Sequence, residues 1–157
     1  MKKEKLTTLL IFVIGTELVG ALSALLSGGN FSAFYESLNQ PPFAPPGWLF
    51  PVMWAILYAL MGISAYQIYD SDDDRKSKAL WIYFIQLAVN FSWSIVFFRF
   101  QSLLGAVIVI VILLILIALM MIAFGQIRKS AALLNIPYLL WVLFATYLTM
   151  GVYLLNR

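Results

Sequence analysis

Five long apolar stretches, separated by short polar segments, dominate the pattern of this chain. A helix needs about 20 apolar residues to cross the hydrocarbon core of a bilayer, and each stretch is long enough. The predicted helices lie at 6–26, 47–69, 79–98, 103–125 and 131–154, with ends accurate to a few residues. The pattern therefore predicts an all-α, five-transmembrane-helix bundle in which residues 1–157 form a single domain.

The connection between the first two predicted helices is much longer than the others. It runs for about 20 residues, whereas helix connections in bundles are usually far shorter, and such loops often serve as lids. Within it Phe31, Phe34, Tyr35 and Leu38 recur at helical spacing. We expect a short amphipathic helix there, lying either over the mouth of the bundle or on lipid headgroups.

Residues 41–58 hold five of the six prolines and then continue as an apolar run. Proline fixes φ and lacks an N–H, so a proline-rich segment favours extended chain, and the next helix begins at Pro46 or later. An interfacial aromatic belt together with the helix start would by itself explain Trp48 and Phe50, and a functional role for these two residues is equally open. The segment predicts a rigid lid built from Pro41, Pro42, Pro45 and Pro46.

The composition agrees with a membrane protein and restricts its chemistry. The chain is 63% hydrophobic and 11% charged, whereas soluble domains are about half apolar and a quarter charged. It contains no cysteine and no histidine. These absences exclude disulfides, thiolate catalysis, the usual zinc sites, Ser-His triads, and His or Cys ligation of haem iron. We expect no metal site, no cofactor and no nucleic-acid partner.

The basic residues indicate an orientation. With five spans, the N-terminus and the loops at 70–78 and 126–130 share one side, which carries eight of the ten Lys and Arg residues. Arg99 and Arg157 lie on the other side. The positive-inside rule then predicts a multi-pass protein of a bacterial cell membrane with its N-terminus in the cytoplasm.

Two polar features lie inside predicted spans. Glu17 is an intramembrane carboxyl group, which is either protonated and hydrogen-bonded to another helix or part of a functional site. Gln86, Asn90, Trp93 and Phe97 fall on one helical face, which must point into protein or a cavity because amides facing lipid are costly. Their role, packing or orienting a ligand, stays open.

The aromatic residues are unevenly distributed. All five tryptophans lie on the second, third and fifth predicted helices, whereas 103–125 is almost entirely aliphatic and is expected to face lipid. Small Ala145 leaves room between large neighbours on the fifth helix. These features predict a pocket for a flat apolar ligand, unless the aromatic residues only pack. The pocket residues are Trp54, Tyr58, Asn90, Trp93 and Trp141.

Five motifs stand out between about Leu38 and the C-terminus: Pro41-x-Phe43-x-Pro45-Pro46-x-Trp48, Trp54-x-x-Leu57-Tyr58-x-x-Met61-Gly62, Gln86-Leu87-Ala88-Val89-Asn90-x-x-Trp93, Phe97-Phe98 and Pro137-Tyr138-x-x-Trp141-x-x-Phe144. Through these motifs the chain resembles the TspO family, the bacterial relatives of the mitochondrial translocator protein once called the peripheral benzodiazepine receptor. Some positions depart from the family pattern, including Phe43 for a frequent Trp and Met150 and Leu154 in the region linked to cholesterol in animal members.

The resemblance implies a homodimeric membrane receptor that binds porphyrins, such as protoporphyrin IX, and benzodiazepine-site drugs beneath its first loop. Light- and oxygen-dependent porphyrin breakdown is also linked to the family, with Trp54 and Trp141 as candidate catalytic residues. A proton-coupled transporter that uses Glu17 and a structural scaffold are the alternatives. Carried over residue by residue, the ligand-binding set is Trp54, Tyr58, Asn90, Trp93, Trp141 and Ala145.

Overall fold

The computed structural model describes residues 1–28 and 31–157. Helices account for most of this part of the chain, which contains no strand. The elements are α1 (Lys3–Leu26), α2 (Phe31–Ser37), α3 (Leu49–Tyr69), α4 (Lys76–Ser94), the π-helical turn η1 (Ile95–Arg99), α5 (Leu103–Ile127), α6 (Lys129–Leu133) and α7 (Ile136–Asn156).

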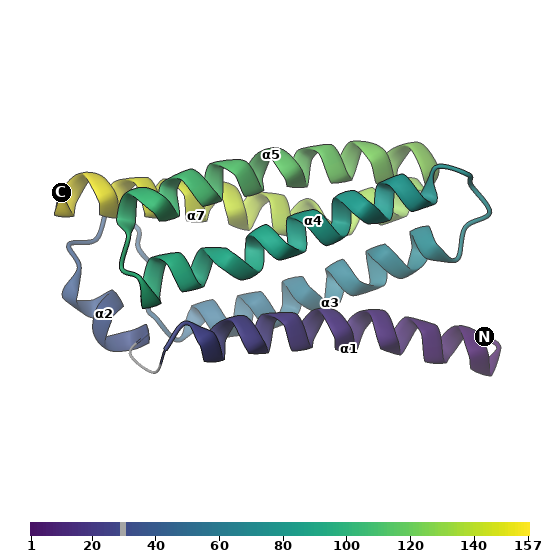
Figure 1. Ribbon diagram of the computed structural model, residues 1–157, viewed down its shortest axis with the longest axis horizontal. Coiled ribbons are helices and arrows are strands. Elements are labelled where there is room, and N and C mark those ends of the chain that lie inside the picture. The colour runs from purple at the N-terminus through teal and green to yellow at the C-terminus, as the bar shows by residue number, and fades with distance from the viewer. Residues whose placement is uncertain (29–30) are drawn as a thin grey trace.

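Five helical segments are long and apolar enough to cross a membrane, which confirms the predicted all-α bundle. One of them combines α4 with η1, and another combines α6 with α7. Their ends differ from the predicted ones by a few residues. The long helices run side by side, with α1 packed mainly on α3, and α5 packed on both α4 and α7 (Figure 1). The two ends of the bundle are therefore formed by helix termini and loops.

The start of α3 follows from its prolines. Trp48 precedes the helix, so Pro51 lies in the first turn, where a missing N–H removes no intrahelical hydrogen bond. Pro137 lies in the first turn of α7 for the same reason. The helix after the proline segment thus begins at Leu49, which agrees with the prediction that it starts at Pro46 or later.

The expectation that the fourth long helix faces lipid is only half correct. Of the most apolar stretch of α5, 28% is buried, compared with 17% for α1, so α1 is the more exposed helix. One face of α5 buries Ile110, Ile117 and Met120, while Ile108 and Ile115 point outward. A helix that is apolar on all sides gives no periodic signal for the face that meets protein.

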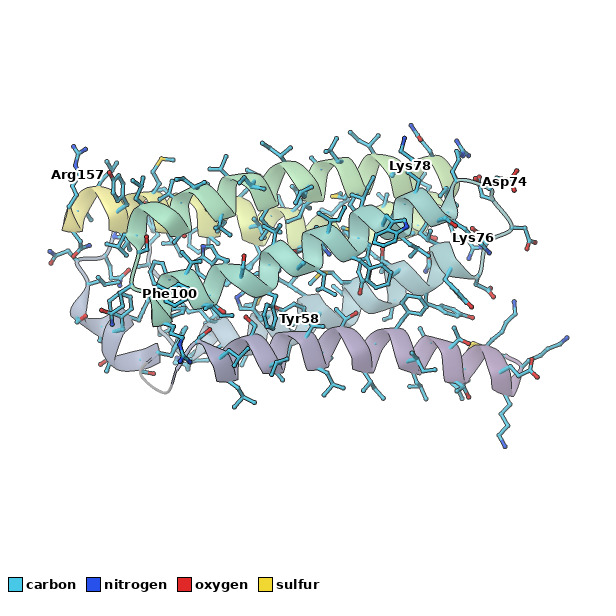
Figure 2. The ribbon with its side chains drawn as sticks, in the orientation of Figure 1. Tyr58, Asp74, Lys76, Lys78, Phe100 and Arg157 are labelled. Atoms are coloured by element: carbon cyan, nitrogen blue, oxygen red, sulfur yellow. The ribbon has the colours of Figure 1, made fainter. Side chains whose placement is uncertain are left out.

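Most of the charge lies at the end of the bundle that holds the N-terminus. Asp74 and Lys78 lie at this end in Figure 2, and Arg157 lies at the other. The Lys5 Nζ atom forms an ion pair with Asp70 Oδ2 at 3.0 Å, which joins the start of α1 to the end of α3. The N-terminus and the 70–78 loop therefore lie at the same end of the bundle, as the sequence predicts.

Candidate ligand-binding site

A cavity of about 340 Å³ lies between α1, α3 and α4, next to the end of the bundle that α2 covers. Its wall is mostly apolar and aromatic, with a few hydroxyl, amide and carboxyl groups. That combination is typical of sites for small hydrophobic ligands. The lining residues are Glu17, Gly20, Ala21, Ser23, Ala24, Ser27, Phe31, Phe50, Pro51, Trp54, Ala55, Tyr58, Asn90, Trp93, Ser94 and Phe98.

Four of the six predicted ligand-binding residues line this cavity. Trp54 and Tyr58 are one turn apart on α3, and their rings stack with centroids 5.5 Å apart. Asn90 and Trp93 come from the face of α4 that the sequence predicts to point inward, and Asn90 is 5% exposed. The structure therefore brings these four side chains together, while their role in binding stays a prediction.

Trp141 and Ala145 lie elsewhere. Trp141 is buried beside α3, and its ring meets the ring of Phe50 edge-on at 5.7 Å between centroids. Ala145 lines a second, smaller cavity of about 30 Å³ next to α7. Phe50, Trp93 and Phe98 line both cavities and so form the partition between them. The six predicted residues thus fall into two neighbouring groups.

A chain of buried hydrogen bonds runs from the cavity into the bundle. The Tyr58 hydroxyl donates to Asn90 Oδ1 at 2.8 Å, and Asn90 Nδ2 donates to the Tyr138 hydroxyl at 2.7 Å. Tyr138 in turn donates to Gln86 Oε1 at 2.7 Å. The chain links α3, α4 and α7, and it satisfies both amides of the predicted inward face. Sequence reasoning noted Tyr138 only as part of a motif, because nothing local reveals its partners.

Helix α1 contributes a wall that the sequence did not predict. The Ser23 hydroxyl donates to the Phe91 carbonyl oxygen at 2.8 Å, and Ser27 donates to Ser94 Oγ at 2.9 Å. Both serines line the cavity. The spacing of Ser23 and Ser27 at i and i+4, which places them on one helical face, is the only local signal for this wall.

Gly20 allows Tyr58 to reach its place in this wall. A Cβ atom at Gly20 would overlap with the Tyr58 ring at Cε2, so the tyrosine ring occupies the space a side chain would take. In Figure 2 Tyr58 lies near the middle of the bundle beside α1. The glycine therefore fixes the position of the hydroxyl group that donates to Asn90.

The predicted amphipathic helix exists as α2 and lies against protein. Burial raises the pKa of the Tyr35 phenol, so this group stays protonated and donates to the Pro45 carbonyl oxygen at 2.7 Å. Gln40 Nε2 donates to the Tyr35 carbonyl oxygen, also at 2.7 Å. Phe31 reaches from α2 into the cavity wall and contacts Phe98, with ring centroids 4.5 Å apart. These contacts tie α2 to the proline segment.

The first two prolines of the lid are attached to α7. Pro41 is buried and packs against Gly151. A Cβ atom added at Gly151 would lie 2.7 Å from the Cβ atom of Pro41. The Tyr147 hydroxyl donates to the Pro42 carbonyl oxygen at 2.8 Å. The proline segment is thus held on one side by α7 and on the other by α2. None of the four predicted lid prolines lines either cavity, and their role as a lid stays a prediction.

Trp48 and Phe50 have different environments. Trp48 is 68% exposed, which fits a position in an interfacial aromatic belt. Phe50 is 9% exposed, and its ring packs edge-on against Tyr35 at 5.2 Å. The aromatic-belt interpretation is therefore wrong for Phe50, because its ring is buried by contacts with Tyr35 of α2 and Trp141 of α7.

Within residues 1–28 and 31–157, no group of three or more His, Cys, Asp or Glu side chains is close enough to hold a metal ion. The chemistry available in the cavity is that of aromatic rings, hydroxyl groups, one amide and one carboxyl group. Groups of these kinds are typical of sites that hold and orient small hydrophobic ligands.

Comparison with known proteins agrees with this architecture. The model of the TspO/MBR family matches residues 10–154. A tryptophan-rich protein TspO from Chlorobaculum tepidum is 38% identical, over 99% of each chain. Protein CrtK from Rhodobacter capsulatus is 34% identical, over 96% of this chain and 94% of its own length. The translocator protein of Bos taurus is 32% identical, over 85% of this chain and 81% of its own. This chain belongs to the TspO/MBR family.

Proposed function

We propose that this membrane protein is a receptor for flat hydrophobic molecules, with porphyrins such as protoporphyrin IX as the main ligand class and benzodiazepine-site drugs as synthetic ligands. The observation that carries the proposal is the cavity of about 340 Å³ beneath α2, with Trp54 and Trp93 in its wall. Aromatic walls favour planar ligands because rings stack offset or meet edge-on. The hydrogen-bonded Tyr58 and Asn90 supply orientation at one edge.

A porphyrin is larger than a drug-sized ligand and needs more room. The partition formed by Phe50, Trp93 and Phe98 separates the cavity from the one that Ala145 lines. Rotation of these side chains joins the two spaces, which brings Ala145 into contact with the ligand. Trp141, which packs on Phe50, then lies next to the enlarged pocket. This rearrangement accounts for a site that includes all six predicted residues.

The test is quenching of tryptophan fluorescence by protoporphyrin IX in detergent. We expect saturable quenching in the wild type, which a purely structural scaffold does not give. Trp54→Ala weakens binding about tenfold, or about 1.4 kcal/mol, because it removes a stacking wall. Trp81→Ala is the matched control, since Trp81 is 68% exposed on α4 and lies outside the cavity. Equal affinities in both variants contradict the proposal.

The enlarged pocket has a separate test. Ala55→Phe fills the main cavity directly, whereas Ala145→Phe fills only the smaller one. A porphyrin that occupies both spaces loses affinity in both variants. A smaller benzodiazepine-site drug that occupies the main cavity loses affinity only in Ala55→Phe. Unchanged porphyrin affinity in Ala145→Phe removes Ala145 from the site.

Light-dependent porphyrin breakdown is a further part of this proposal. Light excites the bound porphyrin and molecular oxygen is the oxidant, so the protein holds the macrocycle and restricts its escape. Trp54 in the cavity wall is the better candidate to exchange electrons with the excited ring, because Trp141 lies behind Phe50. Illumination in air gives a defined product in the wild type. If Trp54→Phe and Trp141→Phe still bind the porphyrin and form the same product, neither tryptophan takes part in the reaction.

Proton-coupled transport is a second candidate function, favoured by the position of Glu17 in the cavity wall. An ionisable group inside a membrane span often forms part of a proton pathway. Proteoliposomes with a pH gradient distinguish transport from binding alone. Substrate flux that disappears in Glu17→Gln supports transport, whereas binding without flux supports the receptor.

The orientation proposed for the protein has its N-terminus in the cytoplasm. Eight of ten basic residues lie at the bundle end opposite α2, and the positive-inside rule assigns that end to the cytoplasm. The lid and the nearby end of the cavity then face the outer side of the membrane.

A further inference from the structure

The charge of the cavity wall limits the ligands it accepts. Among the described residues that line it, Glu17 is acidic and none is a lysine or arginine. The remaining side chains in the wall with polar groups are Ser23, Ser27, Tyr58, Asn90 and Ser94, together with Trp54 and Trp93 through their indole N–H groups. The wall therefore offers one carboxyl group and no basic side chain.

Glu17 differs from the hydroxyl and amide groups of the wall in its partners, and it shares the lack of a partner with the indole N–H of Trp93. Tyr58 and Asn90 are joined to each other, and Ser27 is bonded to Ser94. Within residues 1–28 and 31–157, no hydrogen bond or ion pair is made by the Glu17 side chain. An intramembrane carboxyl group without a partner is costly, and such groups face protein or a cavity rather than lipid. A ligand is therefore well placed to supply the missing partner.

The neighbours of Glu17 restrict the shape of that partner. Gly20 is covered by the Tyr58 ring, while Ala21 and Ala24 present only methyl groups to the cavity. Trp54 provides an aromatic face in the same wall. A planar ring system fits against these surfaces. A cationic nitrogen on that ring system is stabilised both by a charge-assisted hydrogen bond to the Glu17 carboxylate and by a cation–π contact with the aromatic wall.

We propose that Glu17 selects flat aromatic ligands that carry a protonated nitrogen or an N–H donor, and disfavours an anionic group at the same depth. This inference rests on the proposed function, in which the cavity holds a flat aromatic ligand. Protoporphyrin IX meets this requirement of Glu17 when its central N–H groups face the carboxyl group and its own carboxylates point toward the lid. Arg99 lies at that end, where its guanidinium donates to the Leu26 carbonyl oxygen at 3.2 Å.

The test uses three probes with the same three-ring outline: 9-aminoacridine as the cation, 9-methylanthracene as the neutral compound and 9-anthracenecarboxylate as the anion. Binding is followed by tryptophan quenching of the full-length protein at neutral pH. In the wild type the cation binds most tightly and the anion most weakly. Glu17→Gln weakens binding of the cation about tenfold, leaves the affinity for the neutral compound unchanged and raises the affinity for the anion. The reason is that the substitution removes the charge while the side chain keeps its shape.

Glu4→Gln is the matched control, since Glu4 is an exposed acidic residue at the start of the same helix. It leaves all three affinities unchanged. Glu17→Asp keeps the charge and retains the preference for the cation. The wild-type order of the probes tests the inference even if Glu17→Gln does not fold.

The outcomes separate this inference from the proposed function. Equal affinities for the three probes in the wild type, or a cation affinity that Glu17→Gln does not change, overturn the role of Glu17 and leave the binding cavity intact. No saturable quenching by any probe overturns both. A preference for the cation that also disappears in Glu4→Gln assigns the effect to surface charge and overturns the inference.

Discussion

Close contacts at single residues set the geometry of the cavity wall. Tyr58 fits only because Gly20 has no side chain, and its hydroxyl then begins the hydrogen-bond chain through Asn90, Tyr138 and Gln86. Each member of this chain is buried, so a lost partner leaves a polar group without compensation. Local sequence around Gly20 gives no indication of this, because Tyr58 is on another helix.

Gly20→Ala is expected to destabilise the protein by about 1 to 3 kcal/mol, because the new methyl group displaces the Tyr58 ring. Gly15→Ala is the control, since a Cβ atom there meets no atom within 4 Å. That change is neutral or stabilising by about 0.5 to 1 kcal/mol, through the loss of a helical glycine. Thermal unfolding in one detergent, followed by circular dichroism, compares the two. Equal melting temperatures contradict the assigned role of Gly20.

Tyr138→Phe removes the hydroxyl that accepts from Asn90 and donates to Gln86. We expect a loss of about 1 to 3 kcal/mol, because two buried amide groups lose a partner. Tyr153→Phe, at a half-buried tyrosine on the same helix, is the control and leaves the melting temperature unchanged. A melting temperature for Tyr138→Phe equal to that of the control shows that the chain contributes nothing to stability.

At the scale of elements, α2 and the π-helical turn each contribute a phenylalanine, Phe31 and Phe98, to the cavity wall. The turn η1 ends the α4 segment and carries Phe97, which is 4% exposed, and Phe98, which lines both cavities. Single π-helical turns occur often at functional sites, because the extra residue changes the direction of the side chains. On the other side, Pro41 is seated on Gly151 of α7.

Gly151→Ala is expected to loosen the lid, because the Pro41 ring is rigid and has to move away from the new methyl group. Limited proteolysis of the 38–46 segment becomes several-fold faster, and bound protoporphyrin IX dissociates faster, since a lid that opens more often releases its ligand. Gly125→Ala is the control, because a Cβ atom there makes only an ordinary contact, 3.5 Å from Ala132 Cβ. An unchanged cleavage rate in Gly151→Ala shows that this contact does not hold the lid.

At the scale of the whole molecule, the two ends of the bundle differ in charge and structure. One end carries the N-terminus, the 70–78 loop and most basic residues, and the other carries α2, the lid and the C-terminus (Figure 1). Between them the long helices expose mainly aliphatic side chains, which suits a hydrocarbon environment. This asymmetry makes the orientation in the membrane directly measurable.

Single cysteines test that orientation cleanly, because the chain contains none. Glu36→Cys on α2 and Asp74→Cys in the loop after α3 both replace exposed side chains, at opposite ends of the bundle. In intact bacterial cells a membrane-impermeant thiol reagent labels position 36, whereas position 74 is labelled only after permeabilisation. The reverse pattern contradicts the N-terminus-inside orientation.

Length and periodicity were sufficient to predict the five spans, the short helix α2 and the inward face of α4, on which Gln86 and Asn90 are buried. These properties are local: a helix of a given length and polarity has the same requirements wherever it packs. The motifs of the chain were enough to indicate the family, which the comparisons confirm.

Only the tertiary structure decided which helices surround the main cavity. It brought Glu17 and Ser23 of α1, and Ser27 directly after that helix, into the wall, and it left Trp141 and Ala145 behind the partition around Phe50. Helices that are apolar on every side pack through shape and a few hydrogen bonds rather than through a hydrophobic stripe, so their contact faces leave little periodic trace in the sequence. The position of Glu17 in the same cavity wall as Tyr58 and Trp54 could therefore be found only in the folded chain.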